Sequence, residues 1–232
     1  MQSFKDSFHA LVIGASGGLG EAVCGVLSGR ENCSAVVRIS RRENDGFDIT
    51  DESTIRDAAL RLAEGGRAYD LIFDATGTLK IGENGPEKSL SALDPEVMVE
   101  SYRINAVGPA LLLKHFVALM PRSGRSVFAT LSARVGSIGD NRLGGWYSYR
   151  ASKAALNQIM HSASIEVARK RPEAVVICLH PGTVETSLTK GTARSYTHTP
   201  EVAAERLLDV IDRTAPERTG GFFAYDGSEI VW

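Results

Sequence analysis

The chain has 232 residues, of which 43% are hydrophobic and 23% charged, and its net charge at pH 7 is -2. This composition is typical of a globular protein that can bury a full core, and the small negative charge argues against nucleic-acid binding. No apolar run approaches the roughly 20 residues of a membrane span, and the first residues lack the pattern of a signal peptide, so we expect a cytoplasmic protein without a membrane partner. The cysteines and histidines show no metal-binding spacing, and we expect no metal site.

A glycine-rich turn follows the first predicted strand, which covers residues 8–13. Its sequence is Gly14-Ala15-Ser16-Gly17-Gly18-Leu19-Gly20, and a helical pattern continues from it. Glycines let the backbone approach a pyrophosphate, whose charge is then met by N–H groups and the positive end of the helix dipole. We therefore predict a dinucleotide-binding turn. A tight connection without a ligand stays open as the alternative, because the commoner spacing is Gly-x-Gly-x-x-Gly.

The second predicted strand, residues 34–40, ends in Ser40-Arg41-Arg42. An acidic residue at this place would bind the ribose 2′-hydroxyl of NAD, whereas a guanidinium group can bind the 2′-phosphate of NADP by paired hydrogen bonds. Arg41 therefore favours NADP(H) over NAD(H); the alternative is a solvated basic turn with Glu43 as its partner. Residues 47–51 are predicted to form a short third strand, and an amphipathic helix follows over residues 55–63.

The next predicted strand, residues 69–74, ends at a small-residue turn, Ala75-Thr76-Gly77, where a sugar or ring could pass. Residues 79–93 are polar and interrupted by glycines, and they predict an irregular segment. A long helix then starts behind Asp94 as N-cap, and Asn105 lies inside its apolar stretch. A buried amide without partners is costly, so we expect Asn105 to bond neighbouring backbone or to order a water.

The strand predicted at residues 125–131 delivers Ser132 to the carboxyl edge of the sheet, where ligands bind in open parallel sheets. The following helix contains Tyr149 and Lys153 at i and i+4, so both side chains project from one face. A fixed cation near a phenol favours the phenolate and moves its pKa towards neutrality, which suits proton transfer. Tyr147 lies about 120° away from that face by the helical period, so we predict that it only lines the pocket.

A strand at residues 174–179 leads into the loop His180-Pro181-Gly182-Thr183-Val184-Glu185-Thr186, and residues 183–199 are predicted to form a mobile substrate lid. A helix over residues 200–214 and a strand over 221–225 complete the pattern.

Strands alternate with helices six or seven times at short spacing, which predicts a doubly wound parallel sheet of the three-layer α/β Rossmann type. No break in composition marks a second domain, so we expect residues 1–232 to form a single domain.

These residues give the chain a resemblance to the short-chain dehydrogenase/reductase family over nearly its whole length. The ordered motifs that carry it are Gly14-x-x-x-Gly18-x-Gly20, Asp48, Ala75-Thr76-Gly77, Asn105, Ser132, Tyr149-x-x-x-Lys153 and Pro181-Gly182-x-Val184-x-Thr186. Within the family, residues 131–157 and 222–232 resemble the branch of C-factor and sniffer-like carbonyl reductases.

The resemblance implies a role for each matching position. Tyr149 would give or take the proton, Ser132 would orient the substrate oxygen, Lys153 would hold the ribose and lower the pKa of Tyr149, and Asn105 would order a proton-relay water. Besides Tyr149 and Lys153, the positions expected to contact the cofactor are Gly14, Ser16, Gly18, Leu19, Gly20, Arg41, Asp48, Ile49, Ala75, Thr76, Gly77, Pro181, Gly182, Val184 and Thr186.

The chain also departs from the family pattern. Ile13 stands where the family usually has Thr, and Asp74-Ala75-Thr76-Gly77 replaces the usual Asn-Asn-Ala-Gly, so the hydrogen bonds around the adenosine are left open.

We therefore expect an NADP-dependent oxidoreductase of the carbonyl reductase type, which transfers hydride between NADPH and a small carbonyl or alcohol compound. The substrate pocket would be apolar and aromatic, lined by Trp146, Tyr147, Ile138, Leu143 and Tyr196. The alternative is a cofactor-binding signalling or sensor protein of the C-factor type without an obligatory reaction. The intact Ser, Tyr, Lys and Asn set argues against a pure sensor, and a homo-oligomer stays open.

Overall fold

The protein is built on one six-stranded parallel sheet. The computed structural model describes residues 1–4, 7–44, 46–191 and 195–232. The strands lie in the order β2-β1-β3-β4-β5-β6. Their bounds are Phe8–Ile13 for β1, Cys33–Ile39 for β2, Leu71–Asp74 for β3, Ser126–Leu131 for β4, Ala174–His180 for β5 and Phe222–Ala224 for β6. All five neighbouring pairs are parallel, which confirms the predicted doubly wound sheet.

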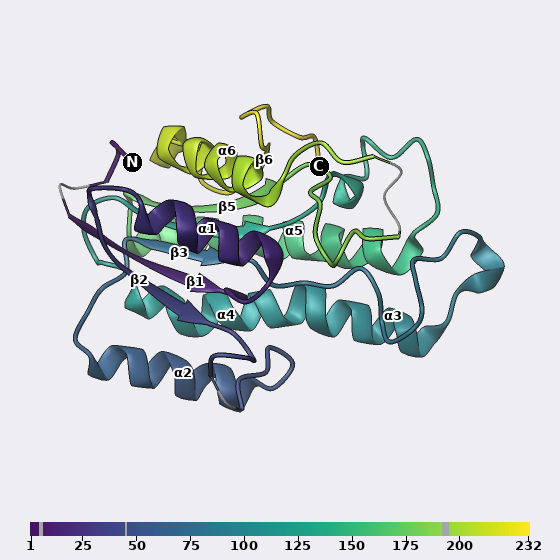
Figure 1. The fold of residues 1–232 in the computed structure, drawn as a ribbon, viewed down its shortest axis with the longest axis horizontal. Coiled ribbons are helices and arrows are strands. Elements are labelled where there is room, and N and C mark those ends of the chain that lie inside the picture. Colours follow the sequence, from purple (N-terminus) through teal and green to yellow (C-terminus); the bar gives the residue numbers. More distant parts are fainter. Residues whose placement is uncertain (5–6, 45, 192–194) are drawn as a thin grey trace.

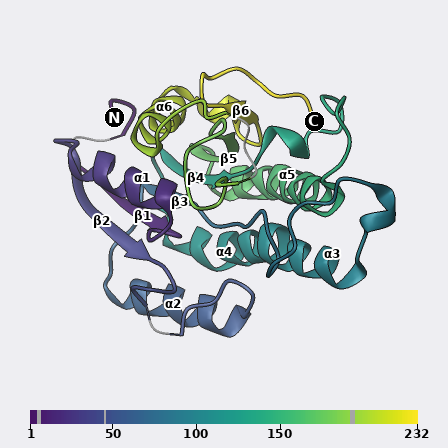
Figure 2. The same ribbon diagram turned by 45° about the vertical axis from the view of Figure 1, so that its right-hand side comes forward.

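Helices cover both faces of the sheet and make three layers (Figures 1 and 2). Helices α1 (Gly18–Ser28) and α6 (Pro200–Arg213) lie on one face. On the other face lie α2 (Glu52–Glu64), α4 (Gly108–Phe116) and α5 (Tyr147–Lys170), and α3 (Pro95–Tyr102) extends the line of α4. A π-helical turn, Arg103–Val107, joins α3 to α4, and short 3-10 turns occur at Leu90–Ala92, Val117–Leu119, Arg134–Gly136 and Pro216–Arg218.

The strands divide their side chains between two hydrophobic cores. In β1, Leu11 and Ile13 pack towards α2, α4 and α5, whereas Ala10 and Val12 pack towards α1 and α6. Successive side chains of a strand point to opposite faces, so a sheet covered on both faces needs strands that are apolar throughout. This requirement explains why continuous apolar runs, and not alternating ones, marked the strands in the sequence.

Residues 47–51 do not form the predicted third strand. The Asp48 carboxylate accepts hydrogen bonds from the backbone N–H and the hydroxyl of Thr50, both at 2.8 Å, and the Asp48 N–H is bonded by the Thr54 hydroxyl at 3.0 Å. An Asp side chain that bonds the backbone two residues on makes a turn, and it thereby competes with a sheet ladder for the same donors. The segment therefore turns directly into α2.

The order of the sheet reverses beside β1. From β1 the chain passes to β2 on one side, and β3 then pairs with β1 on the other side, with Ile13 opposite Asp74. Ligands of doubly wound sheets bind at such a switch point, outside the carboxyl ends of the strands. Gly14 and Ala75, the residues immediately after β1 and β3, therefore lie in the crevice where a dinucleotide is expected.

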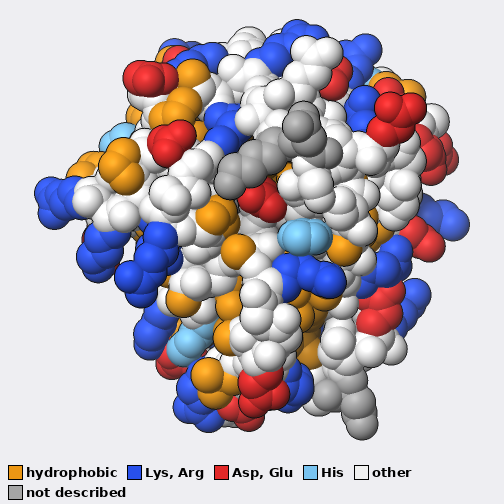
Figure 3. Space-filling view, turned by 90° about the vertical axis from the view of Figure 1, so that its left-hand side faces the viewer, with side chains coloured by type: hydrophobic (Ala, Val, Ile, Leu, Met, Phe, Trp, Pro, Cys, Tyr) orange, Lys and Arg blue, Asp and Glu red, His pale blue; other side chains and the backbone are white. Residues whose placement is uncertain are grey.

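The surface carries charges of both signs. On the face at the left of Figure 1, acidic and basic side chains are spread among hydrophobic and neutral groups (Figure 3). Within the described ranges, no helix is both long and apolar enough to cross a membrane. The same part of the chain contains no cluster of three or more histidine, cysteine or acidic side chains suited to a metal ion.

Candidate active site

The glycine-rich turn is packed so tightly that its glycines cannot be replaced. Gly14 has a φ of 81°, and a Cβ atom on it would lie 3.0 Å from the carbonyl carbon and oxygen of Ala75. A Cβ atom on Gly20 would overlap the carbonyl oxygen of Gly14. The positive φ and the close approach both exclude a larger residue. The predicted turns after β1 and β3 are thus brought together.

The start of α1 is open to an anion. Gly17 is the N-cap residue and has no side chain to bond the first N–H groups of the helix, so these donors point out of the helix end. A Cβ atom on Gly18 would lie 3.0 Å from the side chain of Thr186, which places the loop after β5 beside the turn. Bare N–H groups at a helix N-terminus beside glycines form a site that fits a pyrophosphate. The residues present therefore fit a dinucleotide cofactor.

The basic residues at the end of β2 have different surroundings from those expected. Arg41 is exposed. Glu43, considered as its partner, instead pairs with Arg38 at 2.6 Å between Nε and Oε1, and the other Arg38 amino group donates to the carbonyl of Ala15 at 3.1 Å. Sequence reasoning missed Arg38, although its position opposite Val12 in the sheet register brings it beside the glycine-rich turn.

Asp48 and Ile49, also expected to contact the cofactor, lie in the turn before α2. A Cβ atom on Gly108 would lie 3.0 Å from the carbonyl oxygen of Ile49, so this segment packs against the start of α4.

Lys153 reaches the carboxyl edge of the sheet from the second turn of α5. It is 3% exposed, and its ammonium donates to the carbonyl of Leu131, the last residue of β4, at 2.9 Å. A Cβ atom on Gly77 would lie 3.2 Å from Lys153 Nζ and 3.1 Å from Asn105 Oδ1. The structure therefore brings Gly77, Asn105 and Lys153 together, as the sequence analysis expected from separate motifs.

Asn105 is fully buried in the π-helical turn. Its Oδ1 accepts the N–H of Thr78 at 2.8 Å, and its Nδ2 donates to the Thr78 carbonyl at 2.9 Å. The amide thus bonds neighbouring backbone, which was one of the two outcomes expected of it. The turn is wide because Pro109 has no N–H to donate to the Asn105 carbonyl, and the Gly108 N–H bonds Arg103 five residues back instead.

Asp74 is a buried carboxylate at the end of β3. It accepts hydrogen bonds from the Thr130 hydroxyl at 2.6 Å and from the hydroxyl and N–H of Thr76 at 2.6 and 2.9 Å. Burial raises the pKa of Asp74, against the effect of these donors and of the Lys153 charge. Burial in turn lowers the pKa of Lys153 to about 8, while the Asp74 charge works to raise it. The family's usual Asn at this position would supply no such charge.

The Tyr149 phenol lies in the first turn of α5, and its ring packs edge-on against Trp146 at 6.2 Å between centroids. No described residue forms a hydrogen bond with its hydroxyl. Burial raises the pKa of Tyr149 to about 12, so the expected lowering by Lys153 is not found in the protein alone. The interpretation from sequence weighed the nearby charge and left out desolvation, which disfavours the phenolate. The hydroxyl is therefore protonated at neutral pH.

Ser132 follows β4 directly and is 4% exposed. Its backbone N–H donates to the Leu179 carbonyl at 2.8 Å, and its hydroxyl donates to Oδ1 of Asn157 at 2.6 Å. Asn157 stands one helical turn after Lys153 on α5. Sequence reasoning missed it, although the i+4 spacing that linked Tyr149 to Lys153 extends to this position.

Glu87 caps α5 from the irregular segment before α3. Its carboxylate accepts the N–H of Ser148 at 3.2 Å and also the Ser148 hydroxyl, and the Glu87 side chain is buried. The helix begins behind Trp146, which has a φ of 54° and offers no side-chain cap. A carboxylate at a helix N-terminus satisfies donors that otherwise lack a partner and is favoured by the helix dipole. No local motif could reveal this contact, because 61 positions separate the two residues.

The loop after β5 is partly tied to the residues that follow it. Gly182 has a φ of 80° and packs against the rings of Tyr225 and His198, and the Thr197 N–H bonds the Thr183 carbonyl at 2.7 Å. Val184 is buried. Residues 192–194 of the predicted lid lie outside the described residues.

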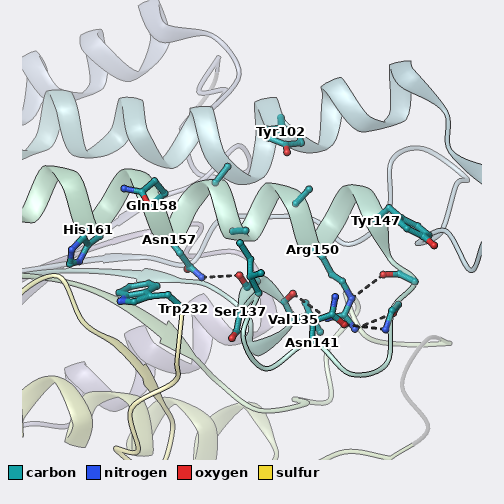
Figure 4. Close-up of a pocket in the computed structure, with 17 residues that line it drawn as sticks. Tyr102, Val135, Ser137, Asn141, Tyr147, Arg150, Asn157, Gln158, His161 and Trp232 are labelled. Carbon is teal, nitrogen blue, oxygen red and sulfur yellow. Dashed lines mark hydrogen bonds between the residues drawn. The ribbon is translucent and has the colours of Figure 1, made fainter. Parts of the chain in front are cut away.

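The largest cavity, of 860 Å³, lies along a different face of α5 from Tyr149 and Lys153 (Figure 4). Tyr147 and Ile138 line it, whereas Ser132, Tyr149 and Lys153 do not. This placement agrees with the helical angle that separated Tyr147 from Lys153. It also means that Tyr147 and Ile138, expected in one substrate pocket with Trp146, are not gathered around the Tyr149 hydroxyl.

The other two residues expected in that pocket protrude from the surface, since Leu143 is 92% and Tyr196 41% exposed.

The sheet, the switch point and the glycine-rich turn define a doubly wound dinucleotide-binding fold. The family model for short chain dehydrogenases matches residues 8–197, and the chain belongs to this family.

Two curated relatives lie in the same family range. The chain is 34% identical over 188 residues to a 1-hydroxy-2-glutathionyl-2-methyl-3-butene dehydrogenase of Rhodococcus sp. strain AD45, covering 81% of this chain and 79% of the relative. It is 35% identical over 152 residues to the C-signal protein of Myxococcus xanthus, covering 65% of this chain and 88% of that protein.

Two solved structures share the fold. The carbonyl reductase Sniffer of D. melanogaster superposes with a TM-score of 0.84 at 20% identity, over 99% of this chain and 100% of that chain. A putative short-chain dehydrogenase/reductase from Burkholderia multivorans with bound NADP gives a TM-score of 0.78 at 26% identity, over 97% and 100%. These likenesses confirm the resemblance to the C-factor and sniffer-like branch.

Proposed function

We propose that this protein is an NADP-dependent carbonyl reductase in which Tyr149 supplies the proton. The observation that carries the proposal is the edge of the sheet at β4. There, a protonated phenol without a hydrogen-bonding partner among the described residues stands one turn before a buried ammonium on the same helix. The glycine-rich turn that fits a dinucleotide lies along the same edge, at the ends of β1 and β3.

Each residue of the edge has a role in the proposed reaction. The reduced nicotinamide of the cofactor supplies the hydride to the carbonyl carbon when it is bound. Tyr149 gives its proton to the carbonyl oxygen, and a pKa near 12 keeps that proton in place up to strongly alkaline pH. Lys153 places a cation beside the site and would hold the ribose. Asn105 fixes the backbone at Thr78 and leaves room for the expected relay water.

The cofactor preference rests on charge at the end of β2. Arg41 is exposed and so can reach a 2′-phosphate, and Arg38 beside the glycine-rich turn adds a second cation. The related Burkholderia multivorans structure contains NADP, which supports the same choice. We propose NADP(H) over NAD(H), with small carbonyl or alcohol compounds as substrates.

The second candidate is a cofactor-binding signalling protein without an obligatory reaction, and the similarity to the C-signal protein favours it. A sensor needs the cofactor cradle but has no need of a buried Lys153 and a protonated Tyr149 at the adjoining edge. We therefore rank the enzyme first. We also propose that the whole chain acts as one domain, with residues 183–199 as its substrate lid.

The test is a panel of carbonyl compounds with NADPH or NADH, read as loss of absorbance of the reduced cofactor. The panel contains 4-nitrobenzaldehyde, acetophenone and a 1,2-quinone, so it covers an aldehyde, a ketone and a diketone. We expect turnover of at least one compound with NADPH, and faster turnover than with NADH. Tight NADPH binding without turnover of any compound would favour the signalling protein.

A further inference from the structure

The Ser132 hydroxyl and the Asn157 amide form a buried pair. The two side chains are 4% and 2% exposed, and 2.6 Å separates Ser132 Oγ from Asn157 Oδ1. Water cannot compete for a hydrogen bond at this depth, and an unpaired partner would bear the full cost of desolvation. The pair therefore holds the serine side chain in one orientation.

The direction of the hydrogen bond follows from the other end of the amide. Asn157 Nδ2 donates to the carbonyl of Gly136 at 3.5 Å, a contact drawn in Figure 4. A carbonyl oxygen only accepts, so the amide nitrogen must face Gly136 and the amide oxygen must face Ser132. The amide oxygen also only accepts. Ser132 is consequently the donor, and its single proton points at Asn157.

Both ends of the pair are fixed to rigid elements. Asn157 stands on the 24-residue helix α5, one turn after Lys153. A Cβ atom on Gly136 would lie 2.9 Å from the backbone of Lys153, so the turn that bonds Asn157 is packed against the same helix. The Ser132 backbone is bonded to β5 through Leu179. The serine oxygen is thus located relative to Lys153 by contacts on two sides.

We propose that Asn157 is a positioning residue that acts through Ser132. It takes the serine proton and so leaves the lone pairs of Ser132 Oγ for the reacting edge of the sheet. There they accept a hydrogen bond from the O–H group that forms when Tyr149 transfers its proton to the substrate oxygen. The inference rests on the proposed function, because it assigns a partner to the serine of that same site.

The experiment is a double-mutant cycle on hydride transfer. Asn157→Leu removes the acceptor with little change of volume, and Ser132→Ala removes the hydroxyl. Single-turnover oxidation of NADPH by 4-nitrobenzaldehyde is measured for the wild type, both single variants and the double variant, together with NADPH binding by fluorescence. We expect Asn157→Leu to lower the rate about tenfold with NADPH binding unchanged. In the Ser132→Ala background the same change should have no further effect.

The matched control is Gln158→Leu. This change also converts an amide to leucine, on the neighbouring residue of α5, but Gln158 donates only to Ser162, on its own helix, at 3.0 Å. Its rate should equal that of the wild type. Asn157→Asp keeps an acceptor oxygen towards Ser132 and should retain more activity than Asn157→Leu, which keeps the inference testable if the leucine variant folds poorly.

The outcomes separate the inference from the proposed function. Independent, multiplicative losses from Asn157→Leu and Ser132→Ala would overturn the inference while leaving the enzyme in place. A wild type that turns over no compound of the panel would contradict the proposed function and the role of Asn157 with it. The same cycle in thermal midpoints then decides whether the pair exists, since additive shifts would mean that Ser132 and Asn157 are not coupled.

Discussion

Removal of the Glu87 carboxylate should loosen the helix end that carries Tyr149. In the Glu87→Ala variant, the N–H and hydroxyl of Ser148 lose the acceptor that now bonds both of them. Loss of a helix cap costs about 1 kcal/mol, and buried donors without a partner cost about 1–3 kcal/mol more. We therefore expect the free energy of unfolding to fall by about 2–4 kcal/mol.

This loss converts into a measurable shift of the melting temperature. For 232 residues the entropy of unfolding is about 0.5 kcal/mol per degree, so Tm should fall by about 4–8 °C. Calorimetry measures the shift. Glu87→Gln keeps an oxygen acceptor and loses mainly the interaction of the charge with the helix dipole, about 1 kcal/mol or less, and should lower Tm by about 2 °C.

Activity distinguishes a structural cap from one that matters for Tyr149. The turnover number should fall about tenfold in Glu87→Ala and within threefold in Glu87→Gln, because only the first lets the turn with Tyr149 fray. The control is Asp94→Ala, which removes an exposed carboxylate cap from α3, with bonds of 2.9 and 3.2 Å to Glu96 and Val97. It should lower Tm by about 2 °C without loss of turnover. Unchanged turnover in Glu87→Ala would refute the reasoning.

Three further predictions concern the chemistry of the site. Tyr149→Phe should leave NADPH binding intact and lower single-turnover reduction by about 10² to 10⁴, whereas Tyr147→Phe, on the cavity face, should change substrate preference at most; the reverse result would place the proton donor wrongly. Arg41→Ala should weaken NADPH binding by about 10- to 100-fold, from charged hydrogen bonds worth about 1.5–3 kcal/mol, with little change for NADH in the same fluorescence titration; equal losses would remove Arg41 from cofactor choice. Asp74→Asn removes a charge that raises the pKa of Lys153, so this pKa should fall below about 8, and an alkaline limb of kcat/KM set by Lys153 should move to lower pH; a limb that stays in place would show that Asp74 does not act on Lys153.

The sequence predicted the strands well because each lies between two cores and must be apolar throughout. It failed at residues 47–51, where Asp48 bonds Thr50 and makes a turn from residues that read as a strand. The need of Asn105 for partners was predictable, because burial of an amide follows from its apolar neighbours. Its partner Thr78 was not, since that contact depends on how two distant segments meet.

The predicted site shows the same limit. Tyr149 and Lys153 could be related by helical spacing alone, but the pKa of Tyr149 depends on burial, which a spacing does not encode. Glu87 and Asn157 carry no motif that marks them. Each acts on the site through a contact made across the fold, so only the three-dimensional arrangement identifies them.

The wide turn at residues 103–107 bears on how the length of this chain can vary. A π-helical turn holds one residue more than the α-helical path requires, so it is equivalent to a single-residue insertion kept inside a helix. Deletion of one residue there would restore a regular helix and rotate everything before it by about 100° relative to α4. The amide of Asn105 would then turn away from Thr78. Gains and losses of length among relatives should therefore fall in the exposed segment 79–93 and spare the helix behind it.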